Sequence, residues 1–236
     1  MSALVSLTEE KDYLRIVMDD GKRNAVSFEM AEELNAAFDD GEKKDKPVVL
    51  AGRPGTFSAG FDLATMARQD ESMVRLVREG ADLAERILRF PQPVVLAVSG
   101  HALAMGAILC LSADYRIGAI GDFKIGLNEV AIGMTLPWFG VELARSRLAQ
   151  ESFHNAVALA KVYSPAQAAA VGFLDECVPE DGLTERAGEF AAQLAALGSK
   201  AHQQTKLRVR EQLLTRYEQA LERDFDGGQI MATMGV

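Results

Sequence analysis

The chain has 236 residues, of which 48% are hydrophobic and 25% are charged. This balance is typical of a globular enzyme and too apolar for a disordered protein, and a chain of this length can bury a core that supports a functional cleft. The formal net charge of −9 argues against nucleic acid as the main partner, because phosphate binding requires a basic face.

Other features of the sequence concern the cellular compartment. Cys110 and Cys177 lie far apart in apolar surroundings, and we expect free, buried thiols in a reducing compartment. The first residues lack the basic and then apolar pattern of a signal peptide. The longest apolar run, residues 93–113, is interrupted by polar residues and glycines, so we expect no membrane span. The chain is therefore predicted to be cytoplasmic.

The first half of the chain alternates strand-like and helix-like segments. Short apolar runs predict strands, and apolar residues spaced three or four apart predict helices. Ser27 can cap the first helix, whose apolar stripe includes Met30 and Phe38. The expected order is a strand at 13–18, a helix after Ser27, a strand at 47–51, a helix at 72–90 and a strand at 93–98. The continuous apolar run of the last strand is typical of a sheet covered on both faces.

The second half begins with a sharp turn and ends in long helices. The expected elements are a turn and buried helix within 99–114, short strands at 114–117 and 123–125, a helix from Ser164-Pro165 to Gly172, and helices at 184–197 and 201–223. This order predicts an α/β fold. We divide it into an α/β core over residues 1–180 and a helical C-terminal region over residues 181–236.

The first candidate site segment is FSAGFDL, which follows a predicted strand. Its small residues, Ser58, Ala59 and Gly60, let a ligand approach the main chain closely. Taken alone, the segment also fits a simple tight turn.

The second candidate segment is residues 99–114, where a strand turns into a helix that begins near Ala104. The first N–H groups of such a helix have no helical acceptor and lie at its positive dipole end. A developing oxyanion is stabilised at such a position. Packing of the same helix on the sheet is also expected, and the two roles are compatible.

The third candidate is Glu129, a lone acid in the apolar segment GLNEVAIGM. A carboxyl group in apolar surroundings has a raised pKa, which suits a base that must take and then return a proton. The alternative is a surface glutamate between a strand and a helix.

Several other chemistries find no support in the sequence. The three histidines are too scattered for a metal triad, so no metal site is expected. The serine-hydrolase motif GxSxG and the dinucleotide-binding motif GxGxxG after a strand are both missing. The basic residues Lys206, Arg208 and Arg210 predict a solvated helix face, with contact to coenzyme A phosphates as the alternative.

Taken together, the segments FSAGFDL, SGHALAMGA, ADYRI and GLNE resemble, in this order and spacing, the crotonase (enoyl-CoA hydratase/isomerase) superfamily. The resemblance extends from about Tyr13 to the final helix. It implies a crotonase-like ββα spiral core and a helical C-terminal region that makes oligomer contacts. It also implies an acyl-CoA substrate, a role in fatty acid β-oxidation, and a homotrimer or hexamer. No cofactor is implied, because coenzyme A is part of the substrate.

The resemblance also implies site residues. The backbone N–H groups of Ala59 and Met105 would form the oxyanion hole for the thioester carbonyl. Substrate-binding residues would be Ser58, Ala59, Gly60, Phe61, Asp62 and Met105. Many relatives have glycine in place of Met105, and the sequence leaves open whether the Met105 side chain narrows the acyl pocket. Leu63, Met66, Met105 and Trp138 are candidates for lining it, and core packing is the favoured role for each of them.

Two acid positions discriminate between activities in this superfamily. Enoyl-CoA hydratases have two catalytic glutamates, and the first position, counted back six residues from Asp114, is Ile108 here. The second is Glu129. The Δ3,Δ2-enoyl-CoA isomerases of mitochondrial type likewise have an aliphatic residue at the first position. They also show a DYRI…IGLNE…G…P pattern like that of residues 114–137.

The sequence therefore predicts an isomerase that moves the double bond of a 3-enoyl-CoA to trans-2-enoyl-CoA. Glu129 would carry the proton from C2 to C4 while the oxyanion hole holds the enolate. The alternatives are a hydratase or another acyl-CoA thioester enzyme on the same scaffold, and a non-catalytic acyl-CoA binding protein.

Overall fold

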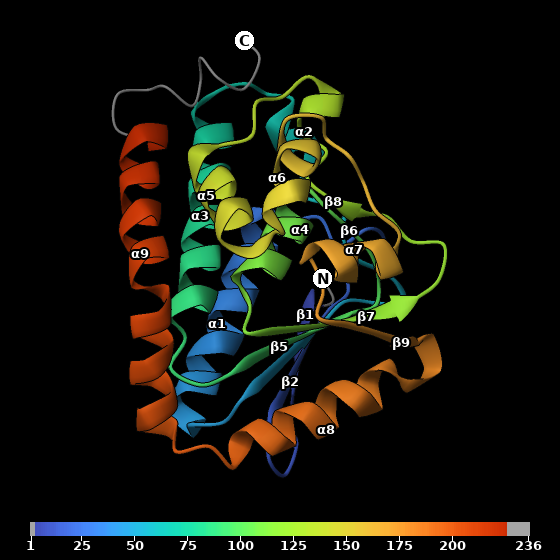
Figure 1. The fold of residues 1–236 in the computed structure, drawn as a ribbon, viewed down its shortest axis with the longest axis vertical. Coiled ribbons are helices and arrows are strands. Elements are labelled where there is room, and N and C mark those ends of the chain that lie inside the picture. Colours follow the sequence, from blue (N-terminus) through green and yellow to red (C-terminus); the bar gives the residue numbers. More distant parts are fainter. Residues whose placement is uncertain (1–2, 226–236) are drawn as a thin grey trace.

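A six-stranded sheet runs through the middle of the molecule in the computed structural model, which describes residues 3–225 (Figure 1). Its order is β1-β2-β3-β5-β7-β9, and only β1 and β2 are antiparallel. The strands are β1 (Val5–Glu9), β2 (Leu14–Met18), β3 (Val48–Ala51), β5 (Val94–Val98), β7 (Tyr115–Ile120) and β9 (Glu176–Pro179). Every residue of β5 is buried, as predicted for a strand covered on both faces.

A second, three-stranded parallel sheet lies beside the first, and only its last strand was predicted, as the segment 123–125. It consists of β4 (Gly55–Ser58), β6 (Gly100–Leu103) and β8 (Ile125–Gly126). Each of these strands directly follows a strand of the large sheet. The chain thus steps from the large sheet to the small one and then into helical segments, and it repeats this path as a ββα spiral. The small strands are short and contain glycine, so they have no clear periodic pattern.

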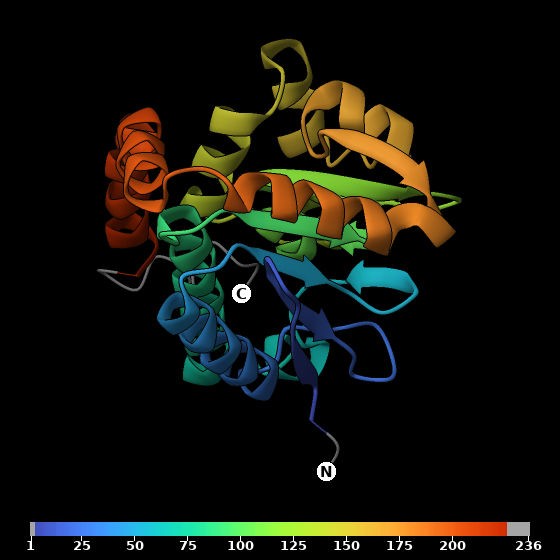
Figure 2. The ribbon, with the colours of Figure 1, turned by 90° about the horizontal axis from the view of Figure 1, so that it is seen from below.

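The helices cover both faces of the large sheet (Figure 2). The helices α1 (Phe28–Lys44), α3 (Glu71–Arg89) and α4 (Met105–Ser112) enclose the larger core. On the other face, α8 (Leu183–Ala195) lies across the strands and packs Leu183, Ala187 and Ala191 against them. The Oγ of Ser27 accepts a hydrogen bond from Met30 N at the start of α1, which confirms the predicted cap.

The remaining helices complete one end and one side of the molecule. They are α2 (Leu63–Met66), α5 (Trp138–Arg147), α6 (Gln150–Val157), α7 (Pro165–Val171) and α9 (Ser199–Phe225), with single 3₁₀ turns η1 (Val130–Ile132) and η2 (Glu180–Gly182). The predicted start of α7 is confirmed by a capping box between Ser164 and Gln167. The division of the chain at residue 180 stays a prediction, and residues 226–236 of the predicted C-terminal region lie outside the described residues.

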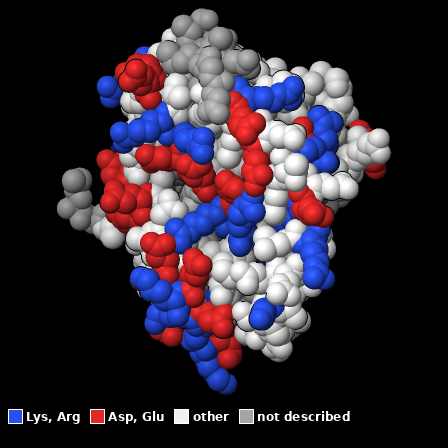
Figure 3. Space-filling view, turned by 90° about the vertical axis from the view of Figure 1, so that its left-hand side faces the viewer, with Lys and Arg blue, Asp and Glu red and all other residues white. Residues whose placement is uncertain are grey.

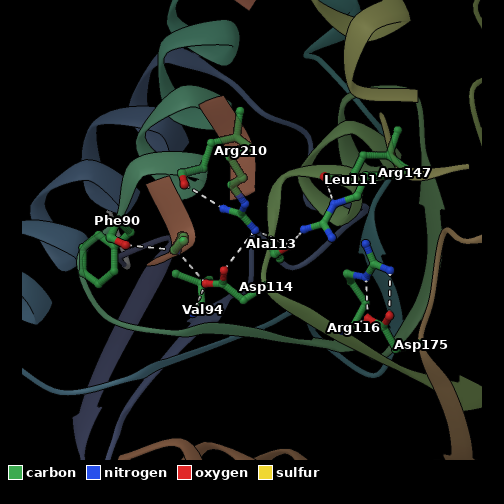
Figure 4. Close-up of polar contacts among 11 residues, drawn as sticks. Phe90, Val94, Leu111, Ala113, Asp114, Arg116, Arg147, Asp175 and Arg210 are labelled. Atoms are coloured by element: carbon green, nitrogen blue, oxygen red, sulfur yellow. Dashed lines mark hydrogen bonds and ion pairs between the residues drawn. The ribbon is translucent and has the colours of Figure 1, made fainter. Parts of the chain in front are cut away.

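A buried ion cluster fastens α9 to the core and corrects one prediction (Figure 4). The Nζ of Lys206 lies 2.6 Å from one carboxylate oxygen of Asp114, and a guanidinium nitrogen of Arg210 lies 2.9 Å from the other. These two basic side chains are only 3% and 8% exposed, whereas Arg208 is exposed. A solvated face was therefore the wrong interpretation for Lys206 and Arg210, because both occupy the side of α9 that faces the core.

The surface formed by α9 and its neighbours carries charges of both signs side by side (Figure 3). Ion pairs such as Arg86–Asp39, Arg89–Glu218 and Arg78–Asp82 contribute to it. Acidic side chains thus interrupt the basic ones on the part of this face that the structure describes.

Both cysteines are free, and the prediction of buried thiols is confirmed only for Cys110, since Cys177 is half-buried. In the part of the chain that the structure describes, no helix is both long and apolar enough to span a bilayer.

Candidate active site

A cavity of about 280 Å³ lies where α2, α4, α5 and the segment after β8 meet. Its walls are mostly apolar, and a few polar groups face it. The lining residues are Arg23, Ala25, Ala59, Phe61, Leu63, Met66, Leu103, Ala104, Ile108, Asn128, Glu129, Ile132, Met134, Pro137 and Phe139. A largely apolar cavity with a few polar groups is typical of a small-molecule site.

Glu129 is the one carboxylate among the residues that line this cavity. It directly precedes η1, and it is only 6% exposed. Its Oε2 is buried and has no hydrogen-bond partner among the described residues. Burial raises the pKa of this carboxyl group from 4.5 to about 7, since the charged form loses its hydration. The predicted apolar surroundings are thus confirmed, and this group can both take up and release a proton near neutral pH.

The raised pKa of Glu129 predicts that replacing this residue by Gln increases the free energy of unfolding. Between pH 4.5 and 7 the unfolded chain ionises this group while the folded chain keeps it protonated, so stability falls as the pH rises. Above pH 7 the loss levels off at about 3 kcal/mol. We expect Glu129→Gln to exceed the wild type in free energy of unfolding at pH 8, with a smaller difference at pH 5. Urea titrations at both pH values measure this, and an equal difference at the two values would contradict it.

The position of the first acid in hydratases also lies in this cavity. Ile108, on α4, is buried and lines the same space as Glu129. An aliphatic side chain therefore occupies a place from which a second carboxyl group would face the cavity.

Asn128 is a polar group that the sequence analysis missed. It lines the cavity beside Glu129, and its Oδ1 is buried without a hydrogen-bond partner among residues 3–225. A buried amide oxygen without a partner is costly unless a ligand or water satisfies it. A polar residue next to the lone acid in an otherwise apolar segment was a signal that could have identified it.

The prediction that Ala59 supplies an oxyanion-hole amide is wrong in this structure. The N–H of Ala59 donates to the carbonyl oxygen of Arg23 at 3.0 Å, so it is already paired. The amide of Gly60 donates to Ser58 Oγ. The amide of Asp62 donates to the carbonyl oxygen of Val26, which lies just before α1. Among the described residues the N–H of Phe61 has no such partner. The free donor of this segment therefore belongs to Phe61, two residues after Ala59.

The second predicted donor, the N–H of Met105, is available. Met105 is the first residue of α4, so its N–H has no acceptor within the helix, and residues 3–225 supply no other backbone acceptor. Gly60 has a φ of +105°, and a Cβ atom there would lie 2.9 Å from Ala104 Cβ and 3.7 Å from Met105 N. The absence of a side chain at Gly60 thus lets the segment that carries Phe61 lie directly against the start of α4.

Other predicted substrate-binding residues have structural contacts instead. The buried Ser58 hydroxyl donates to Asn24 O at 2.7 Å. The Asp62 carboxylate caps α2 and accepts from the amide and hydroxyl of Thr65, both at 2.8 Å. Neither residue lines the cavity, whereas Ala59 and Phe61 do.

Of the four candidate lining residues, Leu63 and Met66 line the cavity, whereas Met105 and Trp138 do not. The side chain of Met105 is completely buried toward α3, where its sulfur lies near Gly80. It therefore does not narrow the cavity. Trp138 is 40% exposed and stacks with the guanidinium group of Arg223, whose carbon lies 4.4 Å from the ring centroid.

A second hollow of about 390 Å³ adjoins the cavity and carries positive charge. It is lined by Arg23, Thr56, Ala59, His101, Leu103 and Lys124, of which Arg23, Ala59 and Leu103 also line the cavity. The Nδ1 of His101 accepts a hydrogen bond from Lys124 N at 3.0 Å, which leaves Nε2 as the donor of the neutral ring. Cationic and N–H groups in this adjoining hollow suit an anionic part of a ligand.

Within residues 3–225, no three His, Cys, Asp or Glu side chains gather closely enough to hold a metal ion.

A family model and individual relatives of known name assign the chain to the same family. The family model described as "Enoyl-CoA hydratase/isomerase" matches residues 9–229. Human mitochondrial enoyl-CoA delta isomerase 1 is 30% identical over 208 residues, which cover 86% of this chain and 68% of the human protein. A putative enoyl-CoA hydratase of Thermus thermophilus is 31% identical over 217 residues, with 87% and 81% coverage.

Solved structures agree in fold. An enoyl-CoA isomerase of Mycobacterium tuberculosis superimposes with a TM-score of 0.92 at 38% sequence identity, and the match covers 97% of this chain and all of the other. The relatives thus share one scaffold, and their names include both isomerases and hydratases.

Proposed function

Since the chain belongs to the enoyl-CoA hydratase/isomerase family, we propose that it converts 3-enoyl-CoA to trans-2-enoyl-CoA. The observation that carries this proposal is the presence of one carboxylate, Glu129, in the cavity that also contains Ile108 at the first acid position. Hydration needs one group to activate water and another to help deliver a proton to the carbon frame. A single carboxylate can instead move one proton between two carbons.

In the proposed mechanism, the ionised Glu129 removes a proton from C2, next to the thioester carbonyl. The electron pair of the broken C–H bond moves into the carbon frame, and negative charge builds on the carbonyl oxygen. The carbonyl bond then re-forms, the enolate electrons become the C2–C3 double bond, and the electron pair of the C3–C4 double bond takes the proton back from Glu129 at C4. The proton that leaves C2 balances the proton that arrives at C4, so no water or cofactor is consumed.

The oxyanion would be held by the backbone N–H groups of Phe61 and Met105. Both amides lack partners among the described residues, and their segments meet where Phe61 and Ala104 line the cavity. One such donor is worth about 3–4 kcal/mol of barrier. Asn128 is proposed as a further polar contact to the substrate, because its Oδ1 is unpaired beside Glu129.

The coenzyme A part of the substrate would occupy the second hollow. Arg23 and Lys124 supply positive charge there and His101 supplies a neutral donor, which suits phosphate groups. The homotrimer or hexamer, the cytoplasmic location and the absence of a cofactor stay predictions. Size-exclusion chromatography with light scattering tests the first of them.

Product identification tests the proposed activity directly. Incubation with a 3-enoyl-CoA is expected to yield trans-2-enoyl-CoA, measured by absorbance of the conjugated thioester and by mass spectrometry. Crotonyl-CoA is expected to remain almost unhydrated. A 3-hydroxyacyl-CoA product would identify a hydratase, free coenzyme A would identify a thioesterase, and tight binding without turnover would identify a binding protein. Each of these three results would contradict the isomerase.

Asp62 and Glu142 are the acids that could replace the missing group, and both are engaged elsewhere. The Asp62 carboxylate caps α2 through the amide of Thr65. The carboxylate oxygens of Glu142 lie 3.4 Å from Arg145 and 3.0 Å from Arg216. These contacts support isomerisation over hydration.

A further inference from the structure

The two residues that carry the unpaired amides send their side chains to the same point on α3. That point is Gly80, which is buried in the middle of the helix. A Cβ atom on Gly80 would lie less than 3.0 Å from two ring carbons of Phe61 and 3.3 Å from the sulfur of Met105. The ring of Phe61 thus rests directly on the backbone of α3, and the Met105 side chain lies beside it.

Helix α9 also holds α3 next to this point. The hydroxyl of Tyr217 donates to the carbonyl oxygen of Ala81, the residue after Gly80, at 2.8 Å. Both residues are completely buried. Because this hydrogen bond restrains α3, added volume at Gly80 must displace the side chains that pack against it. Those side chains belong to Phe61 and Met105.

We propose that Gly80 is a positioning residue that sets the separation of the Phe61 and Met105 amides. This inference rests on the proposed function. The lack of a side chain at Gly80 lets both residues approach α3, and this approach fixes how their backbones lie relative to one another. A methyl group at this position moves one amide relative to the other, and it does so without touching the substrate.

The variant Gly80→Ala tests this inference. A displacement of about 1 Å within an oriented site can reduce the rate roughly 10²-fold, so we expect kcat for 3-enoyl-CoA to fall by about that factor. KM should change less than about 3-fold, because oxyanion donors act mainly on the transition state. A wild-type kcat would overturn the inference. So would a rise in KM alone, which would mean that the Phe61 ring had only swung into the cavity.

Gly188→Ala is the matched control. Gly188 lies within α8 on the far face of the large sheet, and a Cβ atom there would lie less than 3.0 Å from the Oη and Cζ atoms of Tyr13. Like Gly80→Ala, this substitution adds a methyl group to a helical glycine that packs against an aromatic side chain. Unlike Gly80, however, Gly188 is remote from the cavity. We expect wild-type kcat in this variant. A similar loss of kcat in both variants would show a general packing effect and overturn the inference.

The double variant Phe61→Leu/Gly80→Ala tests the contact itself. Leucine is shorter than phenylalanine, so we expect the added methyl group to be accommodated and kcat to recover at least tenfold over Gly80→Ala. If Gly80→Ala does not fold, the folded double variant decides. If the kcat of the double variant is close to that of Phe61→Leu, the inference is supported. If the kcat of the double variant is roughly 10²-fold below that of Phe61→Leu, the inference is overturned. Turnover by the wild type is required in every case, and its absence would refute the proposed function rather than the role of Gly80.

Discussion

Replacing Glu129 by Gln is expected to reduce isomerase turnover roughly 10²–10⁴-fold, the contribution of a positioned acid–base group. Glutamine has a similar shape but cannot accept the C2 proton. Because the side chain is buried in an apolar cavity, binding of a saturated acyl-CoA should stay within a few fold of the wild type. Steady-state kinetics and calorimetric titration measure the two quantities.

The same group should determine the pH dependence of the wild type. Glu129 must be ionised to take the proton, and burial raises its pKa to about 7. The value of kcat/KM should therefore rise with pH through an apparent pKa near 7 and then level off. Glu142→Gln is a suitable control, since Glu142 pairs with Arg145 and Arg216 outside the cavity and its loss should leave this profile unchanged. Near-normal turnover in Glu129→Gln would remove Glu129 from the mechanism.

Replacing Asp114 by Ala is expected to destabilise the fold by roughly 3–5 kcal/mol, the usual effect of removing one partner from a buried ion pair. Asp114 accepts from Lys206, Arg210 and the amide of Val94 (Figure 4). Burial already lowers the pKa of Lys206 to about 8, while Asp114 acts to raise it. Without Asp114, two buried cations would have only backbone carbonyl oxygens as partners.

Urea unfolding at neutral pH measures this effect. Asp40→Ala is the matched control, because Asp40 pairs with Lys43 on an exposed helix face. The loss of an exposed pair should change the free energy of unfolding by less than about 1 kcal/mol. Equal destabilisation by the two variants would show that the Asp114 cluster does not fasten α9 to the core.

The sequence by itself determined the features that depend on neighbouring residues. Periodic apolar residues predicted α1, α3 and α9 within a few residues, and the continuous apolar run predicted the buried strand β5. The apolar segment around Glu129 predicted a buried acid. Spacing along the chain located Ile108, and the structure places both residues in one cavity. These features depend on whether short segments are buried. Local composition and spacing indicate such burial directly.

Only the tertiary structure decided which groups are free to act. Whether Ala59 or Phe61 offers its amide depends on a carbonyl oxygen of Arg23, in a distant loop. The direction of the Met105 side chain depends on the bare backbone at Gly80. Arg210 is buried because Asp114, 96 residues away in the chain, lies opposite it. In each case the partner comes from a remote segment, and a hydrogen bond or a close packing contact depends on atomic positions that periodicity does not specify.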